Sequence, residues 1–214
     1  MTLNPVTIIV LLIALSLAPF VALLVTSFVK MVIVMNLVRN ALGVQQVPPN
    51  MVLNGLAIML TLYVMFPVVK EVTTTASSMK FEFNSLVEIK GVAEKLQAPI
   101  QKFLNKHTVK KNKAFFLKTA GKLWPKSDSE NLRDDNLLVL IPAFTVSELT
   151  EAFQIGFLLY LPFIAIDLIV SNILLALGMM MVSPMTISLP FKLMLFVIIN
   201  GWSKLIHGLV LTYR

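Results

Sequence analysis

Asp167 and Lys192 are the most informative charged residues for function, because each interrupts a long apolar stretch. An unpaired charge in such surroundings is costly, so each side chain should have a partner or water. If the chain reverses near residues 179 and 180, both lie about twelve positions from the turn, or about 18 Å along a helix. They could therefore pair across one hairpin or across the seam to another copy. A proton relay through Asp167 would need a neighbouring histidine or second carboxylate.

Glu148 and Glu151 stand three positions apart on one predicted helix face and could form a pair of catalytic carboxylates. No histidine or set of metal ligands accompanies them, so salt bridges between helices are favoured. His107 and His207 are isolated, and two separate imidazoles do not make a metal site. The chain has no phosphate-binding loop, nucleophile elbow or dinucleotide fingerprint. We expect no enzyme, no catalytic residue, no metal site and no cofactor.

Methionines cluster in the stretch GMMMVSPMTISLPFK, which begins at Gly178. Four of the chain's 12 methionines lie there, beside one glycine and two prolines. These four are Met179, Met180, Met181 and Met185. Methionine is unbranched and polarizable, so a cluster forms a soft surface that closes around objects of varying shape. Inside a membrane, a broken helix needs cover from protein or a water-filled cavity. The cluster is therefore either a core patch between helices or a constriction in a pathway.

The composition is that of a membrane protein. Of the 214 residues, 57% are hydrophobic and 14% are charged, whereas soluble domains carry roughly a quarter charged residues. The mean hydropathy is +0.84. Cysteine is absent, which excludes disulfides, thiolate nucleophiles and cysteine-based zinc sites.

The charge is concentrated between residues 70 and 136, which hold thirteen of the 18 basic and eight of the 11 acidic residues. This segment of net charge +5 (thirteen minus eight) is a mixed-charge insert and not a stripe for nucleic acid. A basic patch facing anionic lipid headgroups is the alternative interpretation.

Four apolar segments surround the insert. Val6–Val29 is long enough to cross a bilayer and should kink at Pro19. The apolar character continues to Arg39, so we expect the helix to extend beyond one membrane thickness. Asn40–Asn50 is a turn, and Met51–Val69 is the second apolar helix.

Within the insert, apolar residues recur at helical spacing, with an interruption expected at Pro99. The stripe consists of Leu86, Ile89, Ala93, Leu96, Ile100 and Phe103. A second helical piece is expected over Lys113–Trp124, ended by Pro125. Ala152–Leu177 and Met185–Leu211 are the third and fourth apolar helices.

The predicted fold is therefore all-α, with two long hydrophobic helical hairpins joined by a mostly helical insert. The predicted segments are residues 1–69, 70–136 and 137–214.

Two long strings carry a family resemblance. They are TSFVKMVIVMNLVRNALGVQQVPPNMVLNGLAIMLTLYVM and LIPAFTVSELTEAFQIGFLLYLPFIAIDLIVSNILLALGMMMVSPMTISLPFKLMLFVIINGW. The chain resembles the FliP/SctR family of type III secretion export-apparatus proteins over residues 26–69 and 140–202, and only loosely over the insert. The short chain and the absence of a cleavable signal peptide favour the injectisome (SctR) branch over the flagellar branch.

The resemblance implies the core pore-forming subunit of an export gate in the bacterial inner membrane. Five copies are implied, together with SctS-like and SctT-like subunits, SctU-like and SctV-like components, and needle or inner-rod proteins. Much of the complex would project to the periplasmic side and pass unfolded substrates. No nucleic-acid partner is implied.

The resemblance also implies roles for particular residues. The cluster Met179, Met180, Met181 and Met185 is similar to the gasket that narrows the family's closed pore. Salt bridges between subunits fall on Glu148, Asp167 and Lys192. The alternatives are a small-solute or ion channel or transporter subunit, which would move ions alone, and a purely structural membrane scaffold.

Charge counting gives a mixed prediction of topology. The lysine-rich insert would be cytoplasmic by charge, but it is longer than the about 60 residues for which the positive-inside rule holds. The turn over residues 30–50 carries Lys30 and Arg39 without an acid. We therefore expect that turn on the cytoplasmic side and the insert in the periplasm.

Overall fold

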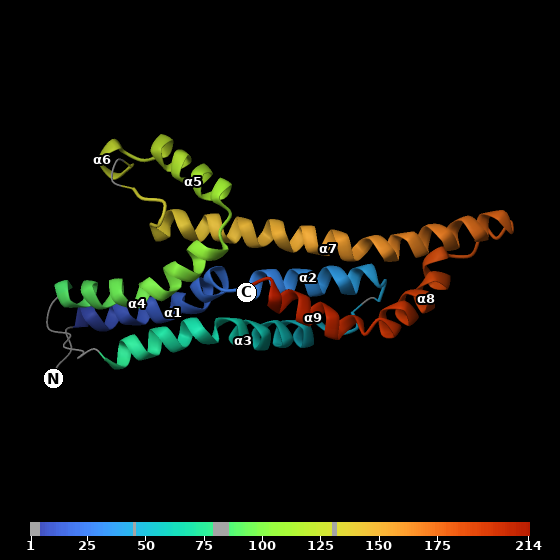
Figure 1. Ribbon diagram of the computed structural model, residues 1–214, viewed down its shortest axis with the longest axis horizontal. Helices are drawn as coiled ribbons and strands as arrows, with labels where there is room; N and C mark the ends of the chain where they lie inside the picture. Colours follow the sequence, from blue (N-terminus) through green and yellow to red (C-terminus); the bar gives the residue numbers. More distant parts are fainter. Residues whose placement is uncertain (1–4, 45, 79–85, 130–131) are drawn as a thin grey trace. The chain divides into compact units, whose positions relative to one another are not determined.

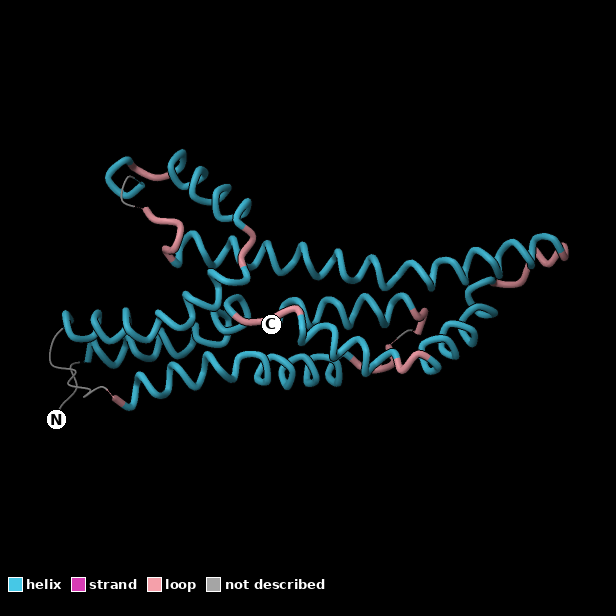
Figure 2. The backbone as a smooth tube through the Cα atoms, in the orientation of Figure 1, coloured by secondary structure: helices cyan, strands magenta, loops and turns pink. Residues whose placement is uncertain are grey.

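The computed structural model of the chain (Figure 1) describes residues 5–44, 46–78, 86–129 and 132–214. Helices make up most of these ranges, and no strand occurs within them (Figure 2). The all-α prediction is confirmed. The helices are α1 (Pro5–Val25), α2 (Phe28–Ala41), α3 (Asn50–Ser77), α4 (Leu86–His107), α5 (Lys110–Leu123), α6 (Lys126–Ser129), α7 (Leu137–Ala176), α8 (Pro184–Ile198) and α9 (Gly201–Leu211).

The chain divides into two compact units, and the long helices α3 and α7 each contribute residues to both. The first unit comprises Met1–Val29 and Met65–Glu148, and the second comprises Lys30–Val64 and Leu149–Arg214. These units follow contacts between helices, whereas the three predicted segments follow hydropathy. The division into those three segments stays a prediction.

In the first unit, α4 packs on the start of α7 through aromatic side chains. The ring centroids of Phe103 and Phe144 lie 5.9 Å apart, and those of Phe103 and His107 lie 4.8 Å apart. Leu104 and Leu140 beside them are fully buried. His107 is half-buried and packs against Phe103.

The helix α4 passes through Pro99 without a break, contrary to the expected interruption. Proline removes one backbone donor and disturbs one turn, but Pro99 is buried, so its packing offsets part of that cost. Within the predicted stripe, Phe103 is buried, and Leu96 and Ile100 are half-buried. The other members, Leu86, Ile89 and Ala93, have side chains outside the described part of the structure.

In the second unit, α2 approaches α7 closely at Gly156. A Cβ added at Gly156 would lie 2.2 Å from Leu37 Cδ1, so the approach depends on the missing side chain of glycine. The inward side of α2 carries buried residues at helical spacing. They are Lys30, Met31, Val34, Met35, Val38 and Ala41.

Two of the predicted apolar helices are broken. The first leaves helical geometry at residues 26 and 27, where the Thr26 hydroxyl donates to the carbonyl of Ala22 at 2.7 Å, while Pro19 lies inside α1. The predicted single helix Met185–Leu211 is α8 and α9, which meet at 61°. Asn200 between them has φ +53°, and a left-handed residue cannot continue a right-handed helix.

Two other helices exceed their predicted bounds. The helix α3 passes through Pro67 and continues to Ser77, inside the predicted insert. The helix α7 begins at Leu137, well before the predicted start at Ala152, and is 40 residues long. At about 1.5 Å per residue, a helix of this length spans about 60 Å, roughly twice the about 30 Å core of a bilayer.

By length and composition, α3 and α7 could each cross a membrane, and only 22% and 17% of their most apolar windows are buried within the chain. The pairs Pro19–Val25 with Phe28–Ala41 and α8 with α9 also pass if each broken pair is one span. Two to four spans, with their outer faces open to lipid or partner chains, agree with a membrane protein.

Candidate functional site

The methionine cluster occupies the reversal between α7 and α8. Gly178 has φ +73°, and its N–H donates to the carbonyl of Leu175 at 3.0 Å, while Met179 N–H donates to Leu174 at 2.9 Å. This pair of bonds forms a Schellman cap, which satisfies carbonyls at the helix end. Pro184 then starts α8, where its missing N–H costs nothing. Backbone chemistry alone therefore fixes where the cluster projects.

The methionine side chains of this turn are exposed within the single chain. Met181 is 101% and Met180 82% exposed, and Met179 and Met185 are also exposed. Exposed apolar side chains gathered in one place indicate a surface that something else covers. Within one chain, the structure places all four candidate residues together but in no core.

Three side chains form a polar cluster between α7 and α8, the two helices that this turn connects. Lys192 Nζ donates to Asp167 Oδ2 at 2.6 Å, and the Ser188 hydroxyl donates to Asp167 Oδ1 at 2.6 Å. Lys192 also donates to the carbonyl of Ala41, the last residue of α2, at 3.3 Å. The cluster therefore ties three helices of the second unit together.

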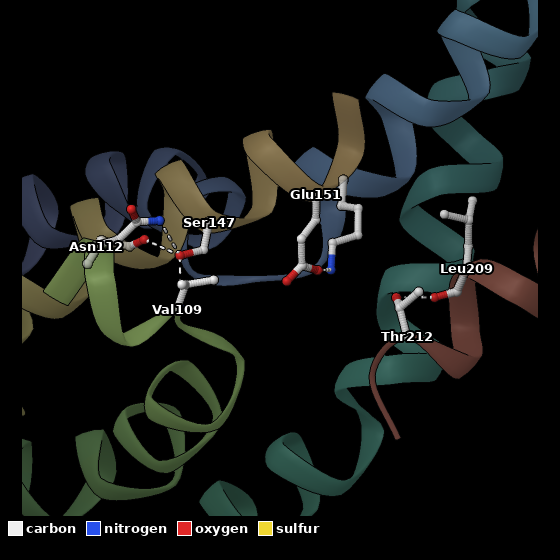
Figure 3. A network of polar contacts seen from close by, with 8 residues as sticks. Val109, Asn112, Ser147, Glu151, Leu209 and Thr212 are labelled. Atoms are coloured by element: carbon white, nitrogen blue, oxygen red, sulfur yellow. Dashed lines mark hydrogen bonds and ion pairs between the residues drawn. The ribbon is translucent and has the colours of Figure 1, made fainter. Parts of the chain in front are cut away.

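A second buried charge lies on α2. Lys30 is 1% exposed, and its Nζ lies 2.7 Å from Glu151 Oε2 of α7 (Figure 3). The same Nζ lies 4.3 Å from the ring centroid of Tyr213, within the range of a cation–π contact. The residue next to the C-terminus thereby joins α2 and α7 at one charged centre.

An apolar groove borders the polar cluster in the second unit. It has a volume of about 380 Å³ and is lined by α7 and α8 residues that include Ile169, Ile173, Ile187 and Phe191. The apolar groove thus lies next to a charged pair of which Lys192 is buried and Asp167 is partly exposed.

Comparison with known proteins settles the family. A family model described as the FliP family matches residues 11–209. The chain belongs to the FliP family.

Three relatives indicate which branch of the FliP family this sequence resembles. The chain is 50% identical over 213 residues to the hypersensitivity response secretion protein HrcR of Ralstonia nicotianae, covering 97% of each chain. It is 51% identical over 210 residues to the Yop proteins translocation protein R of Yersinia pestis, covering 98% of this chain and 97% of the relative. It is 45% identical over 217 residues to the virulence protein YscR of Salmonella typhimurium, covering 98% and 97%.

These relatives confirm the resemblance and the injectisome branch. Proteins of this group are structural components of type III secretion export apparatus, and with the apolar helices this makes the FliP-family chain a membrane component of such a system. Membership also implies assembly with other secretion subunits in the inner membrane.

Of the three residues expected in contacts between subunits of this FliP-family protein, two pair inside one chain. Asp167 and Lys192 meet across the α7–α8 reversal, the first of the two alternatives that their spacing left open. Glu148 is fully buried in the first unit. Their role between subunits stays a prediction.

The sequence interpretation missed the Lys30–Glu151–Tyr213 centre, because it assigned Lys30 to a turn. The helix α2 begins at Phe28, so Lys30 is a helical residue, and counting it as a loop charge was wrong. The loop between α2 and α3 spans residues 42–49 and carries no basic residue. Arg39 closes that loop by donating to Asn50 Oδ1 at 2.5 Å. The salt bridge between helices that was expected for Glu151 is formed with Lys30. A lone basic residue between apolar neighbours was the available signal for its partner.

Proposed function

We propose that this chain is a pore-forming subunit of the inner-membrane export gate of a type III secretion system. Its methionine turn would close the channel through which unfolded substrates pass. The observation that carries the proposal is the exposure of four methionines at one capped helix reversal, in a chain whose family belongs to export apparatus.

The chemistry of methionine supports this role. A thioether side chain is apolar, so a ring of them excludes water and ions from a narrow passage at rest. It also has three rotatable bonds and a polarizable sulfur, so the same ring can deform around passing side chains of any type. A rigid Leu or Phe ring would seal equally well but would adapt less.

The proposed gate needs several copies, five by family resemblance, with SctS-like and SctT-like subunits around them. The largely uncovered outer faces of α3 and α7 support such an assembly. Asp167, whose side chain is 36% exposed, and buried Glu148 and Lys192 would form salt bridges between copies. SctU-like and SctV-like components, needle or inner-rod proteins and unfolded substrates complete the proposed partners.

We place the insert on the periplasmic side, with much of the assembly projecting there. The 40-residue α7 supports a projection out of the membrane, because it is too long for one bilayer, while its length is the same argument for either side. The family resemblance supports it as well. A reporter fused near Asn105 tests the side directly.

The test replaces Met179, Met180 and Met181 by alanine in the assembled complex. We expect ion leakage through membranes containing the variant complex, while secretion of a reporter substrate persists. The matched control replaces Met51 and Met59, which are similarly exposed on α3 but distant in sequence from the turn. Unchanged conductance in the triple variant would refute the gasket role. Ion flux through the purified chain alone would instead favour a small-solute channel.

A further inference from the structure

The carboxyl end of α2 lies beside both the polar cluster and the methionine turn. Lys192 Nζ donates to the carbonyl of Ala41, the last residue of α2, at 3.3 Å. A Cβ added at Gly43 would lie 3.9 Å from the same Nζ and 4.0 Å from Met185 Cγ. The backbone at Gly43 therefore adjoins one of the four clustered methionines and the buried lysine at once.

Gly43 forms the cap that ends α2. Its φ is +76°, which glycine adopts without strain, and its N–H donates to the carbonyl of Asn40 at 3.0 Å. Leu42 before it is buried, and its N–H donates to the carbonyl of Val38 at 3.0 Å. The Lys192 ammonium beside the last carbonyls complements the negative end of the helix dipole. Backbone bonds, a buried side chain and a buried cation thus hold this cap.

Met185 is held by its own helix as well. Pro184 at the start of α8 precedes it and restricts the backbone there. The Ser188 hydroxyl, which donates to Asp167 Oδ1 at 2.6 Å, also lies 3.2 Å from the Met185 carbonyl oxygen. The backbone of Met185 is therefore linked to the polar cluster, while its side chain lies beside the end of α2.

The other three methionines have different surroundings. Met179, Met180 and Met181, here the turn methionines, lie between α7 and α8 and outside both helices. Met180 and Met181 are the two most exposed of the four. The cluster thus combines one methionine on a supported helix with three on a turn.

We propose that the capped end of α2 is the fixed support of the methionine gasket. It holds Met185 in place, so the turn methionines carry the deformation when a substrate passes. Flexible thioether side chains can close again around a changing object only if the backbone frame behind them keeps its position. This inference rests on the proposed gasket role. It assigns Gly43 as a positioning residue, because Gly43 acts through Met185.

A disulfide between the two positions tests whether the support is fixed. The chain has no cysteine, so Gly43→Cys with Met185→Cys introduces the only two thiols. A sulfur at position 185 would take nearly the place of Met185 Cγ, 4.0 Å from a Cβ at position 43, within reach of a disulfide after small rotations. Oxidation of the assembled complex with copper phenanthroline should give an intrachain disulfide, seen as a faster band on a non-reducing gel.

The oxidised and reduced forms of this cysteine variant should secrete a reporter substrate equally and leak ions equally, because a fixed support does not move during opening. The control pair is Gly55→Cys with Met185→Cys. Gly55 lies in α3 of the same unit, and no atom lies within 4 Å of its added Cβ. This pair should not form the disulfide.

Gly43→Asn tests the support without cysteine. Asparagine tolerates positive φ better than most residues, so α2 can still end there, but its added atoms would press on Met185. We expect a several-fold rise in ion leakage through the assembled complex, at unchanged complex yield and unfolding midpoint. Gly55→Asn adds the same side chain at a position without close neighbours and should not raise leakage.

A cysteine pair that stays reduced in the assembled complex would overturn the proposal. A cross-linked complex that secretes only after reduction would also overturn it, because the end of α2 would then move during opening. Equal leakage in Gly43→Asn and Gly55→Asn would do the same. If the gasket role itself is wrong, alanine at the turn methionines causes no leak although the disulfide forms, which separates that failure from a failure of the support.

Discussion

Lys192 Nζ lies 2.6 Å from Asp167 Oδ2, so two residues 25 positions apart pair within one chain. The ammonium group is almost fully buried, whereas the carboxylate is 36% exposed. The pair thus joins α7 to α8 near their reversal, and the Asp167 side chain stays partly accessible. Any contact that this pair makes with a neighbouring copy would build on an arrangement already formed in the single chain.

Removing one member of this pair should cost more than removing both. Asp167→Ala would leave the buried Lys192 charge without its carboxylate, at about 3 kcal/mol, the low end for buried pairs because Asp167 is partly exposed. Replacing Lys192 by Met and Asp167 by Leu together should recover part of that loss. Thermal unfolding of the purified chain and complex yield on a native gel measure both effects. Additive losses in the double variant would contradict the coupling.

Ser188→Ala tests the second hydrogen bond to the same carboxylate. Ser188 is fully buried, and a bond to a charged group contributes about 1.5–3 kcal/mol, so a loss near the low end is expected. Ser203, an exposed serine of α9, gives the control substitution Ser203→Ala, which should leave stability unchanged. If unfolding midpoints of the two variants coincide, Ser188 has no role in holding Asp167.

The Tyr213 ring should stabilise the buried Lys30 ammonium. Comparing Tyr213→Phe with Tyr213→Leu isolates the ring, since both variants lack the hydroxyl. A cation–π contact away from water contributes about 1–2 kcal/mol, so the Leu variant should be less stable by about that amount. Chemical denaturation of the full chain in detergent measures the difference. Equal stability of Phe and Leu variants would rule out the ring contribution.

Gly156→Ala should destabilise the contact between α2 and α7. The new methyl group would lie 3.2 Å from Leu37 Cβ as well as against its Cδ1 atom, so side-chain rotation alone cannot relieve the overlap. A cost of about 1–3 kcal/mol is typical of such overpacking. Gly55→Ala is the control, because no atom lies within 4 Å of its added Cβ. Leu37→Ala should rescue Gly156→Ala, and a variant pair without rescue would place the strain elsewhere.

Several features followed from local sequence. Long apolar runs predicted the spanning helices, because a bilayer and a hydrophobic core both select for them. Asp167 and Lys192 could be matched from the position of one Gly/Met turn, since equal helical depth follows from the rise per residue. Lys113–Trp124 and its end at Pro125 anticipated α5 within a few residues. The family was also visible in the two long strings, and the comparisons confirmed it.

Where helices broke was less predictable. Pro67 and Pro99 lie inside α3 and α4. Pro99 is buried, so its packing offsets part of the cost of one lost hydrogen bond, whereas Pro67 is exposed within the chain. The second apolar hairpin instead breaks at Asn200, a residue with no strong preference to break helices in sequence rules. Local propensity is a small term, and tertiary contacts overrule it.

The sequence by itself determined that this is an all-α membrane protein of the FliP family, with a methionine-rich turn and few charged residues in its apolar segments. Only the tertiary structure decided that Asp167 and Lys192 pair within one chain and which partner Lys30 has. The sequence suggested a loop position for Lys30, whereas α2 places it against Glu151 and Tyr213. Likewise, the inner side of α5 is defined by its hydrogen bond to Ser147 of α7. Helical periodicity gives the direction of each side chain about its own axis, but partners across helices depend on how those axes pack, which no local pattern encodes.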